Sequence, residues 1–226
     1  MDNSLFFGNL CAILPRMKTY AYIDASNLFY GGEKSLGWRI DYQKLLEYLQ
    51  DKYQVSKIYY FGGIEIHRFP FDYINQNSVP IKEVEDYLVK YIRDKKRYIT
   101  EEKLALFNHH LKRVRFYLKL AEFGYQMLLK PVKTYTNTNG DVERKANCDV
   151  DMTLYMMRDC NECARAIFLS GDGDFLPVLK YLKENKKEVV VLARAPRTAR
   201  QIKQFAGDKF LDFEYLREIL KFEDNP

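Results

Sequence analysis

The chain has 226 residues, 47% of them hydrophobic, and a formal net charge of +5. This length and composition suffice for one sizeable core and are typical of a single α/β domain. No stretch offers the 18 or more consecutive apolar residues that a membrane-spanning helix needs. Four cysteines without regular spacing argue against a disulfide framework, so we expect a cytoplasmic protein without a membrane partner.

The first 17 residues are mostly apolar between Leu5 and Leu14, and the basic residues Arg16 and Lys18 follow this run. A signal peptide has the opposite charge order. We expect residues 1–17 to form an N-terminal extension that packs on the domain or on a second subunit, and residues 18–222 to form one domain. Met17 is an alternative start.

The pattern of residues 18–63 predicts a β-α-β unit, and hence a parallel sheet. Lys18 to Ile23 is rich in tyrosine and isoleucine and reads as a strand that ends at Asp24. Leucines at helical spacing follow around residues 45–49. Val55 to Phe61 reads as the second strand, and Gly62-Gly63 is expected to close it.

After a loop at residues 70–80, residues 81–123 predict two amphipathic helices that enlarge the domain. Between Lys82 and Lys133 there are 13 Lys or Arg against 7 Asp or Glu, so the chain's basicity is concentrated there. Such clusters can bind RNA phosphates, although an ordinary solvated helix face is the alternative. The candidate phosphate contacts are Lys95, Lys96, Arg97, Lys112, Arg113 and Arg115.

The remaining pattern alternates strands and helices to the C-terminus. A second basic group, on and just before a helix opened by Pro196, consists of Arg194, Arg197, Arg200 and Lys203. The expected elements are a strand at 125–134, a turn at 137–140, a helix from about 149, strands at 166–169, 188–193 and 210–212, and a last helix at 213–222.

The segment Ser170-Gly-Asp-Gly-Asp174 joins a buried strand to a helix. Its glycines permit backbone angles that other residues avoid, and Asp174 can cap the helix. Asp172 is then left as a metal-ligand candidate, because ligands of open α/β sheets bind beyond the carboxyl ends of strands. The alternative is an Asx-turn followed by a cap.

A third acidic element is Asp149-Val-Asp151, at an expected helix N-terminus. Asp149 is a plausible cap and Asp151 lies in the first turn, where carboxylates are electrostatically favoured without any further role. If the strands ending at Asp24 and Ser170 are neighbours, this helix N-terminus reaches the same edge. Clustered carboxylates repel unless a cation neutralises them, and oxygen ligands select Mg²⁺ or Mn²⁺.

Three motifs in this order, Ile-Asp24-Ala-Ser-Asn27, Cys-Asp149-Val-Asp151 and Leu-Ser170-Gly-Asp172-Gly-Asp174, resemble those of the NYN domain family. That family belongs to the PIN-like nuclease superfamily, and the LabA-like branch is the most similar. The resemblance implies a three-layer α/β/α sandwich with a central, mostly parallel sheet and metal-dependent cleavage of RNA. It further implies metal-binding catalytic acids at Asp24, Asp149, Asp172 and Asp174, and positioning roles for Asn27 and Ser170. We assign Asp151 to substrate positioning as well.

The chain departs from the family at Ala25, where glycine is common, and in the lead-in to Asp149, which leaves open whether Asp149 or Asp151 faces the metal. No Ser/His or Cys/His nucleophilic set is present, and Cys160-Asn-Glu-Cys163 lacks two further zinc ligands. The serious alternative to a ribonuclease is a non-catalytic RNA-binding or scaffold protein with the same fold. A second copy of the chain is a candidate partner.

Overall fold

The computed structural model describes residues 18–29, 34–136 and 142–223. The expected N-terminal extension and the expected turn at 137–140 lie outside these residues. Within them, no helix is both long and apolar enough to cross a bilayer.

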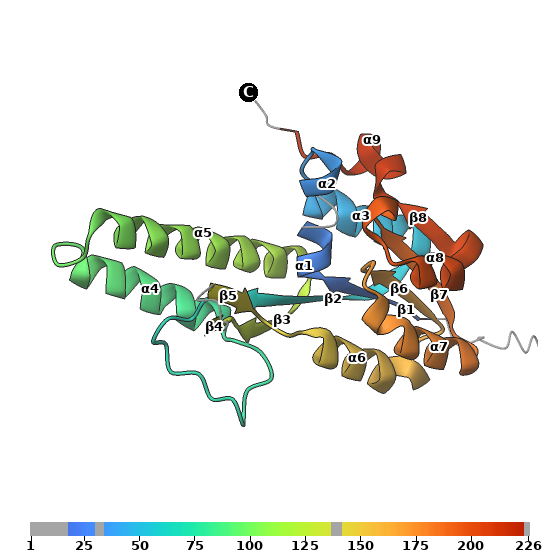
Figure 1. Cartoon of the computed structure of the whole chain (residues 1–226), viewed down its shortest axis with the longest axis horizontal. Coiled ribbons are helices and arrows are strands. Elements are labelled where there is room, and N and C mark those ends of the chain that lie inside the picture. Colours follow the sequence, from blue (N-terminus) through green and yellow to red (C-terminus); the bar gives the residue numbers. More distant parts are fainter. Residues whose placement is uncertain (1–17, 30–33, 137–141, 224–226) are drawn as a thin grey trace, which may run out of the picture.

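A six-stranded sheet forms the centre of the molecule, with the order β3-β2-β1-β6-β7-β8 (Figure 1). Every neighbouring pair in it is parallel, as the β-α-β pattern predicts. The strands are β1 (Thr19–Asp24), β2 (Val55–Ile64), β3 (Gln126–Pro131), β6 (Arg165–Leu169), β7 (Glu188–Ala193) and β8 (Phe210–Asp212).

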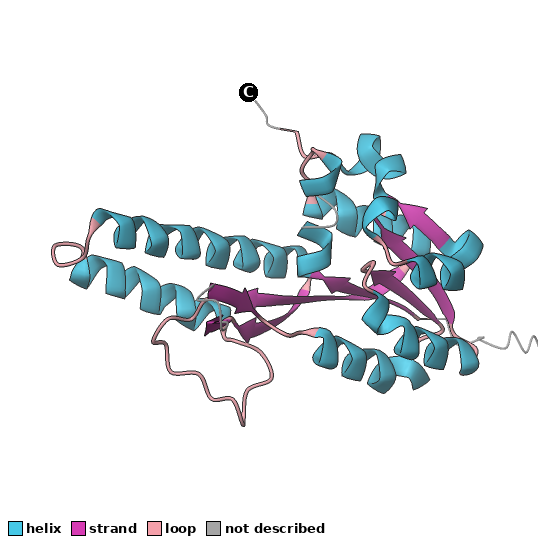
Figure 2. Cartoon of the chain, in the orientation of Figure 1, coloured by secondary structure: helices cyan, strands magenta, loops and turns pink. Residues whose placement is uncertain are grey.

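Alternation along each strand divides the core into two halves. In β1, Ala21 and Ile23 contribute to one hydrophobic cluster, whereas Tyr20 and Tyr22 contribute to the other. Helices cover both faces, which gives the predicted three-layer α/β/α sandwich (Figure 2). One face carries α3 (Tyr42–Tyr53) and α9 (Arg217–Leu220), and the other carries α6 (Asp149–Arg158), α7 (Leu176–Glu184) and α8 (Arg200–Ala206).

The two predicted extra helices form a hairpin of α4 (Ile81–Lys95) and α5 (Glu101–Phe123) that projects beyond the carboxyl ends of the strands (Figure 1). Thr100 caps α5 by accepting a hydrogen bond from the Lys103 amide, and Gly124 ends it in a left-handed conformation. Val84 and Leu88 of α4 and Val114 of α5 are buried, so the base of the hairpin belongs to the core.

The glycines of β2 do not end that strand, contrary to our expectation. β2 continues through Gly62 and Gly63 to Ile64. A Cβ atom at Gly63 would lie 2.7 Å from the Ala146 Cβ and 2.9 Å from the Val132 Cγ2. The glycine is therefore needed for close packing and not for a turn.

The expected strand at 125–134 divides at Val132 into β3 and β4 (Lys133–Thr136), which pairs with β5 (Val142–Lys145) in a separate ribbon. The helix expected after Pro196 is divided into the 3₁₀ turn η4 (Ala195–Arg197) and α8, with the extended residues Thr198 and Ala199 between them, and the helix expected after Phe213 begins as the 3₁₀ turn η6 (Phe213–Leu216). The other short elements are α1 (Ala25–Asn27), α2 (Lys34–Leu36), η2 (Asp159–Asn161), η3 (Gly173–Phe175) and η5 (Gly207–Lys209).

Candidate acidic site at the strand switch point

The strand order reverses between β1 and β6. From β1 the chain adds β2 and β3 on one side, and β6, β7 and β8 lie on the other. Ile23 pairs with Leu169 in the parallel register, so the segments that begin at Asp24 and Ser170 leave the sheet side by side. Such a switch point is where open α/β sheets bind ligands.

Asp24 is held at this edge by hydrogen bonds to both of its carboxylate oxygens. Its Oδ1 accepts from the amides of Ser26 at 3.0 Å and Asn27 at 3.1 Å, which makes it the cap of α1. Its Oδ2 accepts from the Ser170 hydroxyl at 3.1 Å. These bonds fix the orientation of the carboxylate and leave a lone pair of Oδ2 for another ligand.

Asn27 and Ser170 link the two strand ends. The Asn27 Oδ1 accepts from the Gly171 amide at 2.9 Å, and the buried Ser170 Oγ accepts from the Asp172 amide at 3.2 Å. The two residues that the family resemblance names as positioning residues therefore tie the β1 turn to the β6 loop.

We expected Asp174 to be the helix cap, but in the structure Asp172 is the cap. Asp172 is the residue that caps, because its Oδ1 accepts from the Asp174 amide at 3.0 Å, and Asp174 is an exposed residue of η3. We expected Gly171 to adopt a backbone angle that other residues avoid, but its φ angle is not positive. It is small because a Cβ there would lie 2.8 Å from the Thr198 Cα.

Asp149 and Asp151 have different surroundings. The expected cap, Asp149, is instead the first residue of α6, and Cys148 takes the cap position without a side-chain bond. The negative charge of Asp149 acts on Asp24, whereas Asp151 forms an ion pair with Lys130 of β3. Its Oδ2 makes no hydrogen bond of good geometry in addition to this ion pair. The charge of Asp149 therefore acts on Asp24, whereas the charge of Asp151 is offset by Lys130.

Burial raises the pKa of Asp24 from its usual 3.8 to about 6. The hydrogen bonds from Asn27 and Ser170 lower it, but the nearby charge of Asp149 raises it further. Burial, with the charges of Asp151 and Asp24, also raises the pKa of the Cys148 thiol to about 12, so this sulfur stays protonated. Burial therefore disfavours the charged form of Asp24, and the charge of Asp149 adds to this effect.

Among the described residues, no three His, Cys, Asp or Glu side chains converge closely enough to hold a metal ion by themselves. The donor set nevertheless fits Mg²⁺ or Mn²⁺. Mg²⁺ is usually bound through one or two carboxylates, with waters and substrate phosphate as the other ligands. Asp24 and Asp149 supply two carboxylates, and the Oδ2 of Asp24 can accept a further ligand.

The basic residues predicted to contact phosphate fall into two groups. Arg113 pairs with Glu65, Arg115 with Glu85, and Arg194 with both Asp212 and Glu214, so acidic partners offset these charges. The exposed residues for which the described part of the chain shows no acidic partner are Lys95, Lys96, Arg97, Lys112, Arg197, Arg200 and Lys203. Lys95 ends α4, and Lys96 and Arg97 follow it at the tip of the hairpin.

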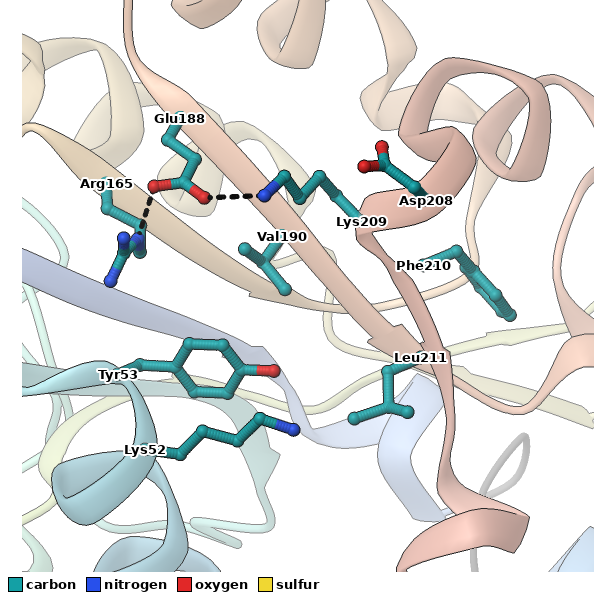
Figure 3. A pocket seen from close by; sticks show the side chains of 9 residues that line it. All are labelled: Lys52, Tyr53, Arg165, Glu188, Val190, Asp208, Lys209, Phe210 and Leu211. Atoms are coloured by element: carbon teal, nitrogen blue, oxygen red, sulfur yellow. Dashed lines mark hydrogen bonds and ion pairs between the residues drawn. The ribbon is translucent and has the colours of Figure 1, made fainter.

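A hollow of about 400 Å³ lies at the opposite edge of the sheet, where β6 and β7 begin (Figure 3). Arg165 and Lys209 flank Glu188 there and form ion pairs with it (Figure 3). Its size does not make it the functional site, because the acids and the loops that position them are at the other ends of these strands.

The residues from 86 to 216 match the model of the NYN domain, more than half of the chain. The chain belongs to the NYN domain family. The match includes the segments around Asp149 and Asp172 but begins after Asp24. The link between Asp24 and the rest of the site therefore rests on the Ser170 hydrogen bond and the β1–β6 pairing.

The chain is also similar over most of its length to the low amplitude and bright protein LabA of Synechococcus elongatus, at 21% identity over 91% of this chain and 88% of the relative. A crystal structure of VPA0982 from Vibrio parahaemolyticus, a protein of unknown function, shares the fold at a TM-score of 0.56 and 17% identity, over 90% of this chain and 96% of that one. These likenesses confirm the LabA-like NYN fold.

Sequence reasoning missed Lys130, which neutralises Asp151. The rule that selected Asp24 also applies to it, because Lys130 lies near the carboxyl end of β3. In the sequence, Lys130 is counted only as one of the basic residues between Lys82 and Lys133. Its partner is 21 positions away in the chain, and no local pattern relates the two.

Proposed function

We propose that the protein is a Mg²⁺- or Mn²⁺-dependent endoribonuclease that hydrolyses RNA phosphodiester bonds at the strand switch point. The observation that carries the proposal is the Asp24 carboxylate, which Ser170 holds where β1 and β6 end and on which the charge of Asp149 acts. Membership of the NYN domain family, which points to a nuclease-type function, supports it.

Each residue of the site has a proposed task. Asp24 and Asp149 hold the metal ion, with Asp172 and Asp174 on the adjoining loop as further acids that can approach when substrate binds. Asn27 and Ser170 keep the two loops in register through their bonds to Gly171 and Asp24. When bound, the metal ion supplies an ionised water and neutralises charge on the phosphate.

A cleavage assay on single-stranded and structured RNA tests this proposal. We expect cleavage with Mg²⁺ or Mn²⁺ and none with EDTA. Binding without cleavage under every metal condition would instead favour the non-catalytic RNA-binding or scaffold alternative.

The tip of the α4–α5 hairpin is the proposed RNA-backbone contact. We expect Lys95→Gln, Lys96→Gln and Arg97→Gln together to weaken binding of unrelated RNA sequences about equally. The slope of log affinity against log salt should become shallower by about 0.7 for each phosphate of a single strand that the variant no longer neutralises. Affinity measured by fluorescence anisotropy over a salt series checks this.

A matched control removes three charges from the opposite edge of the sheet, by changing Lys183, Lys186 and Lys187 to Gln. These residues lie at and after the end of α7, just before β7 begins. If both triple variants lower affinity equally, only net charge matters and the hairpin tip has no special role.

A further inference from the structure

A second hollow, of about 130 Å³, lies between β3 and α6 on the sheet face that α6 covers. Leu128 and Lys130 of β3 and Leu154 and Tyr155 of α6 are among the residues that line it. The proposed cleavage reaction does not use it. The cavity is lined by aromatic, apolar and charged side chains, and these determine the chemistry of a ligand that fits it.

The Arg158 guanidinium group lies over the Tyr155 ring in the wall of this cavity. The Arg158 guanidinium carbon lies 3.9 Å from the centroid of the Tyr155 ring. Its Nε donates to the Asp159 Oδ1 at 3.0 Å and its Nη2 to the Tyr59 hydroxyl at 3.3 Å. The Arg158 side chain is still 51% exposed, so a ligand can reach this positively charged group although its position is held by two hydrogen bonds.

Tyr155 is fixed as well. Its ring packs edge-on against Tyr59 at 5.4 Å and against Phe61 at 5.6 Å between centroids. Hydrogen bonds hold Arg158 and ring contacts hold Tyr155. Little side-chain entropy is therefore lost when a planar group stacks on them. Arg guanidinium planes and aromatic rings are the surfaces on which proteins stack unpaired nucleobases.

The other walls fit the rest of a nucleobase. Leu128 and Leu154 are apolar, whereas Asn77, Lys130 and Asp151 supply hydrogen-bond donors and acceptors. Apolar surfaces with a few convergent polar groups are typical of ligand pockets.

The cavity adjoins the acidic site. Cys148 lines it and directly precedes Asp149, and Asp151 lines it within the first turn of α6. At 1.5 Å per residue, Tyr155 lies about 9 Å along the helix axis from Asp149. That span corresponds to two or three nucleotides at about 3.4 Å per stacked step.

We propose that this cavity is a subsite for one unpaired nucleobase of an RNA strand whose phosphate two or three nucleotides away lies at the acidic site. The inference rests on the proposed function and adds a substrate requirement to it. A base in a duplex is stacked and paired, and extracting it has an energetic cost. The subsite therefore selects single-stranded RNA.

The test compares two ligands in EDTA, a short single-stranded RNA and the same sugar-phosphate chain without bases. We expect the full-length protein to bind the intact RNA about tenfold more tightly, since base stacking dominates the difference. Leu154→Trp, which fills the cavity, and Arg158→Lys, which keeps the charge but removes the plane, should each abolish most of that preference. Affinity for the base-free chain should stay unchanged.

Two further variants make the result decisive. Ile219→Trp on α9 is the matched control, since Ile219 is 50% exposed and Leu154 is 59% exposed, and it should keep the preference. Asn77→Ala changes an exposed loop residue of the cavity and should weaken the preference, so it reports on the subsite even if Arg158→Lys destabilises the buried Asp159.

An unchanged preference in all cavity variants, or no preference in the unmodified protein, would overturn the subsite and leave the ribonuclease proposal standing. Failure to bind either ligand would overturn both the subsite and the proposed RNA contact at the hairpin tip.

Discussion

Replacing Asp24 with Asn is expected to abolish most RNA cleavage and to leave the fold intact. Asn keeps the size of the side chain and can still accept from the Ser26 and Asn27 amides, but it removes the negative charge that faces Asp149. We expect cleavage to fall by about 10²- to 10³-fold, the loss typical when one charge-stabilising group leaves an active site. Single-turnover kinetics with Mn²⁺ measure the effect.

Asp41→Asn provides a matched control. Asp41 caps α3 by the same pattern, accepting from the amides of Gln43 and Lys44. Its own amide donates to the Leu220 carbonyl, which places it against the end of α9 and not in the acid cluster. If Asp41→Asn lowers cleavage as much as Asp24→Asn does, the loss comes from helix capping and the proposed role of Asp24 is wrong.

Asp24→Asn should also stabilise the metal-free protein at neutral pH. The pKa of Asp24 is raised to about 6 in the folded state, so the folded protein binds this proton more tightly than the unfolded chain does. Stability contributed by the protonated group is present below about pH 4 and is lost as pH rises through about 6. Above about pH 7, Asp24→Asn should therefore raise the free energy of unfolding by about 3 kcal/mol, because the pKa difference of about 2 units is worth about 1.4 kcal/mol per unit.

Thermal unfolding in EDTA at about pH 4 and about pH 7.5 measures this difference. At the higher pH we expect the variant to melt about 8 °C above the unmodified protein, and at the lower pH the two should nearly coincide. Asp41→Asn should change neither value, because Asn and Asp cap helices equally well. A variant that is less stable at the higher pH would show that the Asp24 charge is already compensated within the protein.

With Mn²⁺ at the higher pH, the unmodified protein should become more stable than Asp24→Asn. An ion that binds only the folded state raises stability with its concentration, so the unmodified protein should gain and Asp24→Asn should not. An equal gain in both would place the ion elsewhere.

The edge at which the acids meet was predictable from the sequence, since strand ends in a β-α-β pattern share one edge of a parallel sheet. Asp24 and Ser170 illustrate this, because each directly follows a short apolar run. The assignment of caps was not predictable. Cys148 takes the cap position of α6 with φ and ψ of −100° and −6°, and such angles depend on how the preceding segment packs against Gly63.

Long-range pairing accounts for the other differences. Arg113, Arg115 and Arg194 read as free basic residues, but their acidic partners lie just after β2, in α4, and at or beyond the end of β8. The cavity beside α6 was missed for the same reason, because Leu128 and Tyr155 are brought together only by sheet and helix packing. Charge counts over one segment do not contain this information.

Cleavage in oxygen-18-labelled water tests the central claim most directly. If the acidic site directs water at the phosphorus, mass spectrometry should find the label in new 5′-phosphate ends, with 3′-hydroxyl ends on the other fragment, and only when Mg²⁺ or Mn²⁺ is present. Unlabelled 2′,3′-cyclic phosphate ends, or cleavage that persists in EDTA, would contradict the account.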